Sequence, residues 1–260
     1  MYCEKCGNKL NDGAEFCPNC GTPVQSNNKN NQDATPIDNQ EQQDYNHTIK
    51  SREEIKAIAK EAVANQRSNA ILIPFLVSLI STAGTTLEYI PFIGGFAYLA
   101  TVLFVLVLNV GVSGAFIKVY NNETVDVGEP FSNLKYNFGR KLGSMCLTIL
   151  YSWLWALLFV IPGIIKMLAY SMTPYILSEY PNVTATDAIK LSMRMTDGYK
   201  DDLFVLGLSW LGWQILNFFT LGILGIVFLT PYMNATRAGF YQELRDQALA
   251  SGKIKPEELQ

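Results

Sequence analysis

The sequence predicts an all-α polytopic membrane protein, with six transmembrane helices in three hairpins behind a small four-Cys zinc ribbon. Three observations support this fold class. Residues 142–180 form two apolar blocks joined at an Ile-Pro-Gly turn signal, which predicts a helical hairpin. Lys and Arg gather between alternate apolar blocks, as expected when only those segments face the cytosol. Four of the five cysteines lie within the first twenty residues.

Residues 1–24 carry the zinc-ribbon pattern. Two Cys-x-x-Cys-Gly sequences supply four thiolates, from Cys3, Cys6, Cys17 and Cys20. Two intervening residues let both thiolates of a pair reach one ion, and four thiolates complete a tetrahedral Zn²⁺ site with no open position for catalysis. One structural Zn²⁺ is therefore predicted, and a redox pair of dithiols or an iron site are the alternatives.

Residues 25–49 are predicted to form a disordered linker, because Asn, Gln and Asp dominate them and apolar residues are scarce. The single histidine of the chain, His47, lies near the end of this segment and is expected to be solvated. No signal-peptide pattern opens the chain, so the N-terminus is expected in the cytosol. There, reduced thiols favour metal binding over disulfides.

A helix is predicted from Ser51 to Asn69. Ser51 and Glu54 have the spacing of a capping box. One face of this helix is apolar and is formed by Ile55, Ile58, Ala59, Ala62 and Val63. Two interpretations stay open: the helix lies on the anionic cytosolic leaflet, or it extends the first span into the cytosol.

Six spans are predicted within a transmembrane domain of residues 50–246, at residues 70–87, 92–117, 142–161, 164–180, 203–219 and 221–235. Lys and Arg precede the first span, follow every second one, and are absent from the three intervening turns. Both termini are therefore expected in the cytosol, with residues 247–260 as a cytosolic tail and the plasma membrane as the location. Lys166 is the exception, and it lies close enough to a turn to snorkel. A segment with helical spacing precedes each hairpin, which makes three similar units.

Two Thr-Pro-Tyr triplets, at residues 173–175 and 230–232, lie in the second helices of the second and third hairpins. A proline frees one backbone carbonyl, which a neighbouring group must satisfy inside a bilayer. The threonine hydroxyls are expected to bond the backbone locally. We hypothesise that both kinks open a polar pocket toward the cytosol, lined by Tyr175, Tyr232 and Asn234. An aromatic belt that faces lipid is the alternative.

Three segments resemble a known family: IPGIIKMLAYSMTPYILSEYP, DAIKLSMRMTDGYKDDLFVLGLSWLGWQIL and LTPYMNATRAGFYQEL. They are similar to a family of bacterial polytopic membrane proteins catalogued as domain of unknown function 975. The resemblance covers roughly residues 52–246, and several members look like this chain in carrying a short zinc ribbon in front. It supports the topology, and it implies no catalytic residues because the family has no established activity.

No catalytic residues are predicted from the sequence. The spans contain no Asp or His, and Cys146 has no base nearby and is expected to be a buried apolar residue. The chain is therefore interpreted as a non-enzymatic membrane protein with Zn²⁺ as its cofactor and no specific nucleic-acid partner. Two functions remain open. The membrane domain is a platform or regulator whose ribbon recognises a cytosolic protein, or it binds or transports a small or lipid-like molecule.

Overall fold

A computed structural model describes residues 49–260 apart from residues 88, 92–93, 133, 135 and 221. The chain divides into two units, residues 1–46 and 47–260. The predicted zinc ligands Cys3, Cys6, Cys17 and Cys20 lie outside the described residues, as does the predicted linker up to residue 48. The fold below is that of the second unit.

The described residues form helices and no strands, which confirms the predicted all-α class. In chain order they are α1 (Arg52–Asn65), α2 (Arg67–Leu87), α3 (Gly94–Tyr120), α4 (Glu129–Ser132), α5 (Phe138–Leu158), α6 (Val160–Tyr170), α7 (Thr173–Glu179), α8 (Ala185–Met195), α9 (Lys200–Ser209), α10 (Leu211–Phe219), the π-helical turn η2 (Gly225–Leu229), α11 (Thr230–Ala250) and the 3₁₀ turn η3 (Pro256–Leu259).

Five segments of the described chain are helical, long and apolar enough to cross a membrane: Arg67–Leu87, Gly94–Tyr120, Phe138–Leu158, Val160–Glu179 and Lys200–Phe219. The predicted count of six is not confirmed. The apolar part of the sixth predicted span is divided between η2 and the first turn of α11, and α11 then continues as a polar helix. Its continuous apolar run is therefore shorter than the roughly 20 residues of a complete span.

The turn of the second hairpin lies at Phe159, so the prediction of a turn at Ile161-Pro162-Gly163 is wrong. Phe159 is extended, with φ −156° and ψ 137°, and α6 begins at the next residue. Pro162 fits the first turn of α6, where its missing N–H costs no hydrogen bond. Gly163 serves the contact between α5 and α6, since a Cβ there would lie 2.7 Å from Cα of Ala156.

Helix α1 packs against protein through its apolar face. The predicted capping box is present: Glu54 N donates to Ser51 Oγ at 3.2 Å, and Ser51 N donates to Glu54 Oε2 at 2.8 Å. Ile55, Ala59 and Ala62 are fully buried in the core, in contact with α11 and α3. Neither predicted interpretation holds, because this face is covered by protein, and a break at Gln66 separates α1 from α2.

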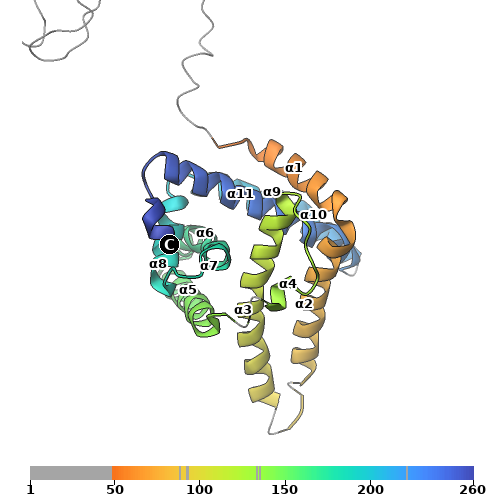
Figure 1. Ribbon diagram of the computed structural model, residues 1–260. Coiled ribbons are helices and arrows are strands. Elements are labelled where there is room, and N and C mark those ends of the chain that lie inside the picture. The colour runs from red at the N-terminus through yellow and green to blue at the C-terminus, as the bar shows by residue number, and fades with distance from the viewer. Residues whose placement is uncertain (1–48, 88, 92–93, 133, 135, 221) are drawn as a thin grey trace, which may run out of the picture. The chain divides into compact units, whose positions relative to one another are not determined.

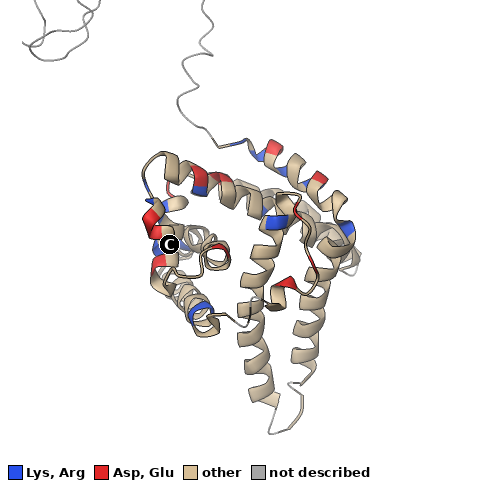
Figure 2. Ribbon diagram, in the orientation of Figure 1, with Lys and Arg blue, Asp and Glu red and all other residues tan. Residues whose placement is uncertain are grey.

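The core lies at the end of the domain that carries the charges. Most buried residues of the core come from α1, the second half of α3, α7, α8 and α11, and α11 contacts α1, α2, α3, α8 and η2. In Figure 1, α11 and α1 lie across one end of the long α2–α3 pair. Figure 2 shows charged residues on α1, α8 and α11, whereas the far half of α2 and α3 carries none.

The far ends of the hairpins expose large apolar side chains. Leu157, Ile161 and Phe218 are 80%, 72% and 80% exposed. Cys146 is exposed on α5, which corrects its prediction as a buried residue. Apolar patches of this extent mark contact with lipid or another protein, and lipid explains them on helices of spanning length. Trp153 belongs to this surface, whereas Trp210 is 4% exposed and packs inside the domain.

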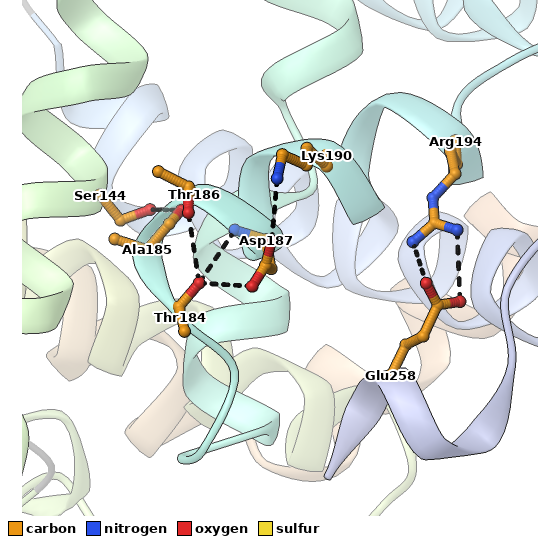
Figure 3. A network of polar contacts seen from close by, with 8 residues as sticks. All are labelled: Ser144, Thr184, Ala185, Thr186, Asp187, Lys190, Arg194 and Glu258. Atoms are coloured by element: carbon orange, nitrogen blue, oxygen red, sulfur yellow. Dashed lines mark hydrogen bonds and ion pairs between the residues drawn. The ribbon is translucent and has the colours of Figure 1, made fainter.

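The C-terminal segment is part of the core. The predicted boundary after residue 246 falls inside α11, which continues to Ala250. Beyond it, Ile254 and Leu259 are buried, and Glu258 accepts two hydrogen bonds from Arg194 of α8, at 2.7 and 3.2 Å (Figure 3). Arg194 thereby fastens residues 253–259 to α8.

Helix α8 begins at a side-chain cap. Asp187 N donates to Thr184 Oγ1 at 3.2 Å, and the same hydroxyl lies 2.6 Å from Asp187 Oδ2 (Figure 3). The hydrogen bond from the Thr184 hydroxyl lowers the pKa of Asp187, and the Lys190 ammonium adds to the effect. Ser144 of α5 donates to the Ala185 carbonyl at 3.1 Å and ties this cap to the second hairpin.

A partly buried acid–base cluster joins α7 to α11. Tyr241 donates its hydroxyl hydrogen to Glu179 Oε2 at 2.5 Å, and Arg245 pairs with the other oxygen of the same carboxylate. Burial raises the pKa of Tyr241 well above its ordinary value, and the neighbouring Glu179 charge adds to the shift. Burial opposes the charge of Arg245, but the carboxylates of Glu179 and Asp246 together outweigh it and raise the pKa of the guanidinium. Arg245 therefore keeps its charge in this cluster.

Gly111 permits the close approach of α4 to α3. A Cβ at Gly111 would lie 2.4 Å from the Pro130 carbonyl oxygen, a backbone atom that cannot swing away, whereas a Cβ at Gly143 of α5 meets nothing within 4 Å. We expect Gly111→Ala to destabilise the domain by about 1–3 kcal/mol through overpacking. Gly143→Ala is expected to stabilise it by about 0.5–1 kcal/mol through helix propensity. Thermal unfolding in detergent measures both, and shifts of the same sign would contradict the packing described.

Candidate functional site

The first Thr-Pro-Tyr triplet starts a new helix after a break. Helix α6 ends at Tyr170 and α7 begins at Thr173, with Pro174 in its first turn. Ser192 of α8 repairs the break: its hydroxyl donates to the Ala169 carbonyl at 2.7 Å and accepts from Met172 N at 3.2 Å. The predicted local bond of Thr173 is wrong, because its buried hydroxyl has no hydrogen-bond partner among the described residues.

The second triplet also starts a helix. The π-helical turn η2 precedes it, and Pro231 lies in the first turn of α11. Upstream, Gly225 N donates to Asn217 Oδ1 at 2.6 Å and fixes the turn between α10 and η2. A Cβ at Gly225 would lie 2.6 Å from that oxygen, so only glycine fits without a shift of Asn217. Pro174 therefore follows a break between two helices, whereas Pro231 follows a π-helical turn that continues directly into α11.

A cavity of about 380 Å³ lies beside the first of these sites, between α3, the α6–α7 junction, α9 and α11. This volume is within the range of small-molecule sites. The cavity has a polar part and an apolar part. Its polar lining residues are Asn109, Ser113, Ser171, Tyr175, Asn234 and Arg237, and its apolar lining residues are Val112, Leu168, Met172, Pro174, Leu203, Leu206, Gly207 and Trp210.

The structure places two of the three predicted pocket residues at this cavity. Tyr175 and Asn234 line it. Tyr175 is 5% exposed, and its ring stacks on that of Tyr241 at 5.3 Å between centroids. Tyr232 is not among the lining residues, and its ring packs edge-on against Trp210 at 4.9 Å between centroids. Tyr232 therefore contacts Trp210, a residue of the cavity wall, and does not line the cavity itself. The pocket function of all three residues stays a prediction.

Sequence reasoning missed Arg237 as a site residue. It counted Arg237 only as one of the cytosolic positive charges, although Arg237 lies three residues after Asn234. Residues at this spacing share one face of a helix, and that signal could have joined the two. The structure brings both to the cavity, from one face of α11.

The polar groups of the cavity differ in how much hydrogen bonding remains to them. Asn109 and Ser171 donate to backbone carbonyls close to them in the chain, those of Val105 at 2.9 Å and Leu168 at 2.7 Å. The side chains of Tyr175, Asn234 and Arg237 make no hydrogen bond or ion pair within the described part of the chain. Tyr175 is buried, Asn234 is half-buried and Arg237 is exposed, so the three side chains are open to a ligand, and only Tyr175 among them is a buried polar group left unpaired.

Two parts of the chain match known protein families. Residues 157–248 match the family described as protein of unknown function, DUF975. This region is therefore similar to the DUF975 family. It starts later than the sequence resemblance indicated, and it contains every cavity residue except the three from α3. No curated protein and no solved structure matches the chain.

Residues 2–24 match a zinc-ribbon domain in front of the DUF975 region. The match spans all four predicted metal ligands, whose geometry lies outside the described residues. Four cysteine thiolates in two Cys-x-x-Cys pairs are the donor set that structural Zn²⁺ prefers, so the residues fit the metal. In the described part of the chain, no group of three or more His, Cys, Asp or Glu comes together.

Proposed function

We propose that this chain is a non-enzymatic membrane protein that binds a small amphiphilic molecule with an anionic head in the cavity between its hairpins. The single observation that carries the proposal is the cavity itself, which is lined by apolar residues and by three polar side chains that make no hydrogen bond or ion pair among the described residues. Arg237 supplies a positive charge, while Tyr175 and Asn234 supply hydrogen-bond donors and acceptors. Trp210 and the leucines around it suit a hydrocarbon part.

Binding explains this lining better than catalysis does. The lining residues include an Arg, a Tyr, two Asn and two Ser, but no carboxylate, His or Cys. A hydrolase or transferase needs a nucleophile next to a base, or a metal with an open position. The lining set offers neither, and four thiolates would close the ribbon's metal site.

The zinc ribbon extends this proposal to a partner. A ribbon that holds one Zn²⁺ through Cys3, Cys6, Cys17 and Cys20 would recognise a cytosolic protein, and the membrane domain would act as its ligand-responsive platform. A pull-down that compares the full chain with a Cys3→Ser/Cys17→Ser variant tests this part. Loss of a protein from the variant's partner list supports recognition by the ribbon, whereas identical lists contradict it.

The cavity is tested with a blocking variant and a charge variant. Gly207 lines the cavity and a Cβ there would meet nothing within 4 Å, so Gly207→Phe adds a ring at the cavity wall without a backbone clash. Gly139→Phe on α5 is the matched control, because its Cβ position is also open and Gly139 does not line the cavity. Arg237→Gln removes the charge and keeps most of the bulk.

The probes are oleate and oleyl alcohol, which share a chain and differ in the charge of the head. We expect oleate to raise the unfolding temperature of the full chain more than the alcohol does. Arg237→Gln should abolish that difference, with about tenfold weaker binding of oleate for the loss of one charged hydrogen bond. Gly207→Phe should abolish the stabilisation by oleate and by oleyl alcohol, whereas Gly139→Phe should abolish neither. Equal responses of Gly207→Phe and Gly139→Phe would rule out the cavity as the site.

A further inference from the structure

A second pocket, of about 350 Å³, lies between α6, α8 and the C-terminal segment, apart from the cavity described above. One side of it is apolar, from Ile165, Ala169 and Met193. The other side is strongly basic, with four cations and one carboxylate: Lys166, Arg194, Lys200, Lys253 and Asp197.

The charged groups of this pocket are held in place by one another. Lys200 Nζ lies 3.1 Å from Asp197 Oδ1, and Lys253 Nζ donates to the Asp197 carbonyl at 2.9 Å. The backbone turn at Gly198, with φ +92°, lies next to this contact. Arg194 is fixed by its two bonds to Glu258, as Figure 3 shows. With Glu258 included, the pocket has four positive and two negative side chains, so its net charge is about +2. Because these charges lie close together, they create a positive potential in the pocket.

The apolar side opens onto the lipid-facing surface of α6. Ile165 is 43% exposed, and its neighbours Ile164 and Met167 are 39% and 57% exposed. Lys166 lies on the same helix, with its ammonium 5.1 Å from the centre of the Trp155 ring. The pocket therefore has a basic end next to the exposed apolar face of α6. These two parts are complementary to the anionic head and the hydrocarbon chains of a phospholipid.

We propose that this pocket holds the phosphate of an anionic phospholipid of the cytosolic leaflet, with the acyl chains along α6. Basic pockets between membrane helices and cytosolic elements are suited to such headgroups. On the predicted topology, α8, Lys200 and Lys253 are cytosolic, so the phosphate lies at the level of the inner headgroups. Lys200 and Lys253 contact the phosphate directly, and Arg194 positions the segment that carries Lys253.

The test uses the purified full-length protein in an uncharged detergent. Its unfolding temperature is measured with phosphatidylglycerol, with phosphatidylcholine of the same chains, and with inorganic phosphate alone. We expect phosphatidylglycerol to stabilise the protein more than either of the others. Lys200→Gln/Lys253→Gln should weaken the apparent affinity for phosphatidylglycerol about tenfold or more, since each Lys near an anionic headgroup contributes substantially to binding.

The matched control is Lys60→Gln/Arg67→Gln, which removes the same charge from exposed positions of α1 and α2. This control should keep the preference for phosphatidylglycerol, and so should the blocked-cavity variant Gly207→Phe, which separates this proposal from the first one. Equal losses of affinity in both double variants would contradict binding at this pocket, as would equal effects of the two phospholipids. A full response to inorganic phosphate would show a site for free phosphate and contradict the proposal of a lipid ligand. Should the double variant fail to fold, Lys253→Gln alone must reduce the preference, and an unchanged preference would reject the proposal.

Discussion

Cys3→Ser/Cys17→Ser is expected to abolish zinc binding and to unfold residues 1–24. Each substitution removes one thiolate from a Cys-x-x-Cys pair, so a closed tetrahedral site can no longer form. In modules of this size metal binding and folding are one equilibrium, with an apparent binding free energy of about 10–16 kcal/mol, and the loss should be complete. Elemental analysis of the full chain should find about one Zn per molecule before the substitution and none after it.

The same substitution should leave the unfolding temperature of residues 49–260 unchanged. The composition of residues 25–49 predicts a flexible linker, and such a linker transmits no packing between domains. A chelator should reproduce the loss of zinc in the unaltered chain, which controls for the substitutions themselves. Iron in place of zinc, or a wild-type chain without metal, would contradict the zinc assignment.

Arg140→Met is expected to lower the free energy of unfolding of the membrane domain by about 3 kcal/mol, since hydrogen bonds from a charged donor are among the stronger ones. The Arg140 guanidinium donates to the carbonyls of Leu177 at 3.1 Å and Tyr180 at 2.9 Å, and also to that of Val183. These carbonyls lie at and just beyond the end of α7, where a helix leaves its last carbonyls without partners. Methionine fills similar space and offers no donor.

Two further variants show whether the hydrogen bonds of Arg140 are responsible. Arg140→Lys keeps the charge but cannot reach three carbonyls at once, so it should recover only part of the loss. Lys190→Met removes the exposed pair with Asp187 and should cost at most about 1 kcal/mol. Thermal unfolding in detergent ranks the three variants. A loss no larger for Arg140→Met than for Lys190→Met would show that α7 does not depend on this cap.

The sequence was sufficient to predict features that depend on residues close together in the chain and that can form in only one way. The capping box of Ser51 and Glu54 formed as predicted, because its two hydrogen bonds involve residues only three apart. The apolar runs likewise predicted the helical hairpins, since a backbone in lipid must satisfy its own hydrogen bonds.

Prediction failed where long-range packing decides the outcome. The apolar face of α1 looked suited to lipid, but α11, which begins only at Thr230, covers it. Gly163 looked like a turn residue, yet its role is to admit Ala156 of the neighbouring helix. The spacing of Asn234 and Arg237 links these two residues to each other, but their position at the cavity depends on the packing of α11 beside α3, which no local spacing encodes.

Both proposals depend on three hairpins that enter from the cytosol, and labelling of single cysteines in intact cells tests this most directly. The background is Cys146→Ala with the four ribbon cysteines replaced by serine. There, a membrane-impermeant thiol reagent should label a cysteine placed at Thr86, at the far end of the first hairpin. A cysteine at Asn122 or Thr196 should react only after the cells are permeabilised. Labelling at Thr196 in intact cells, or protection of Thr86 until permeabilisation, would contradict the topology and remove the basis for a cytosolic-leaflet lipid site.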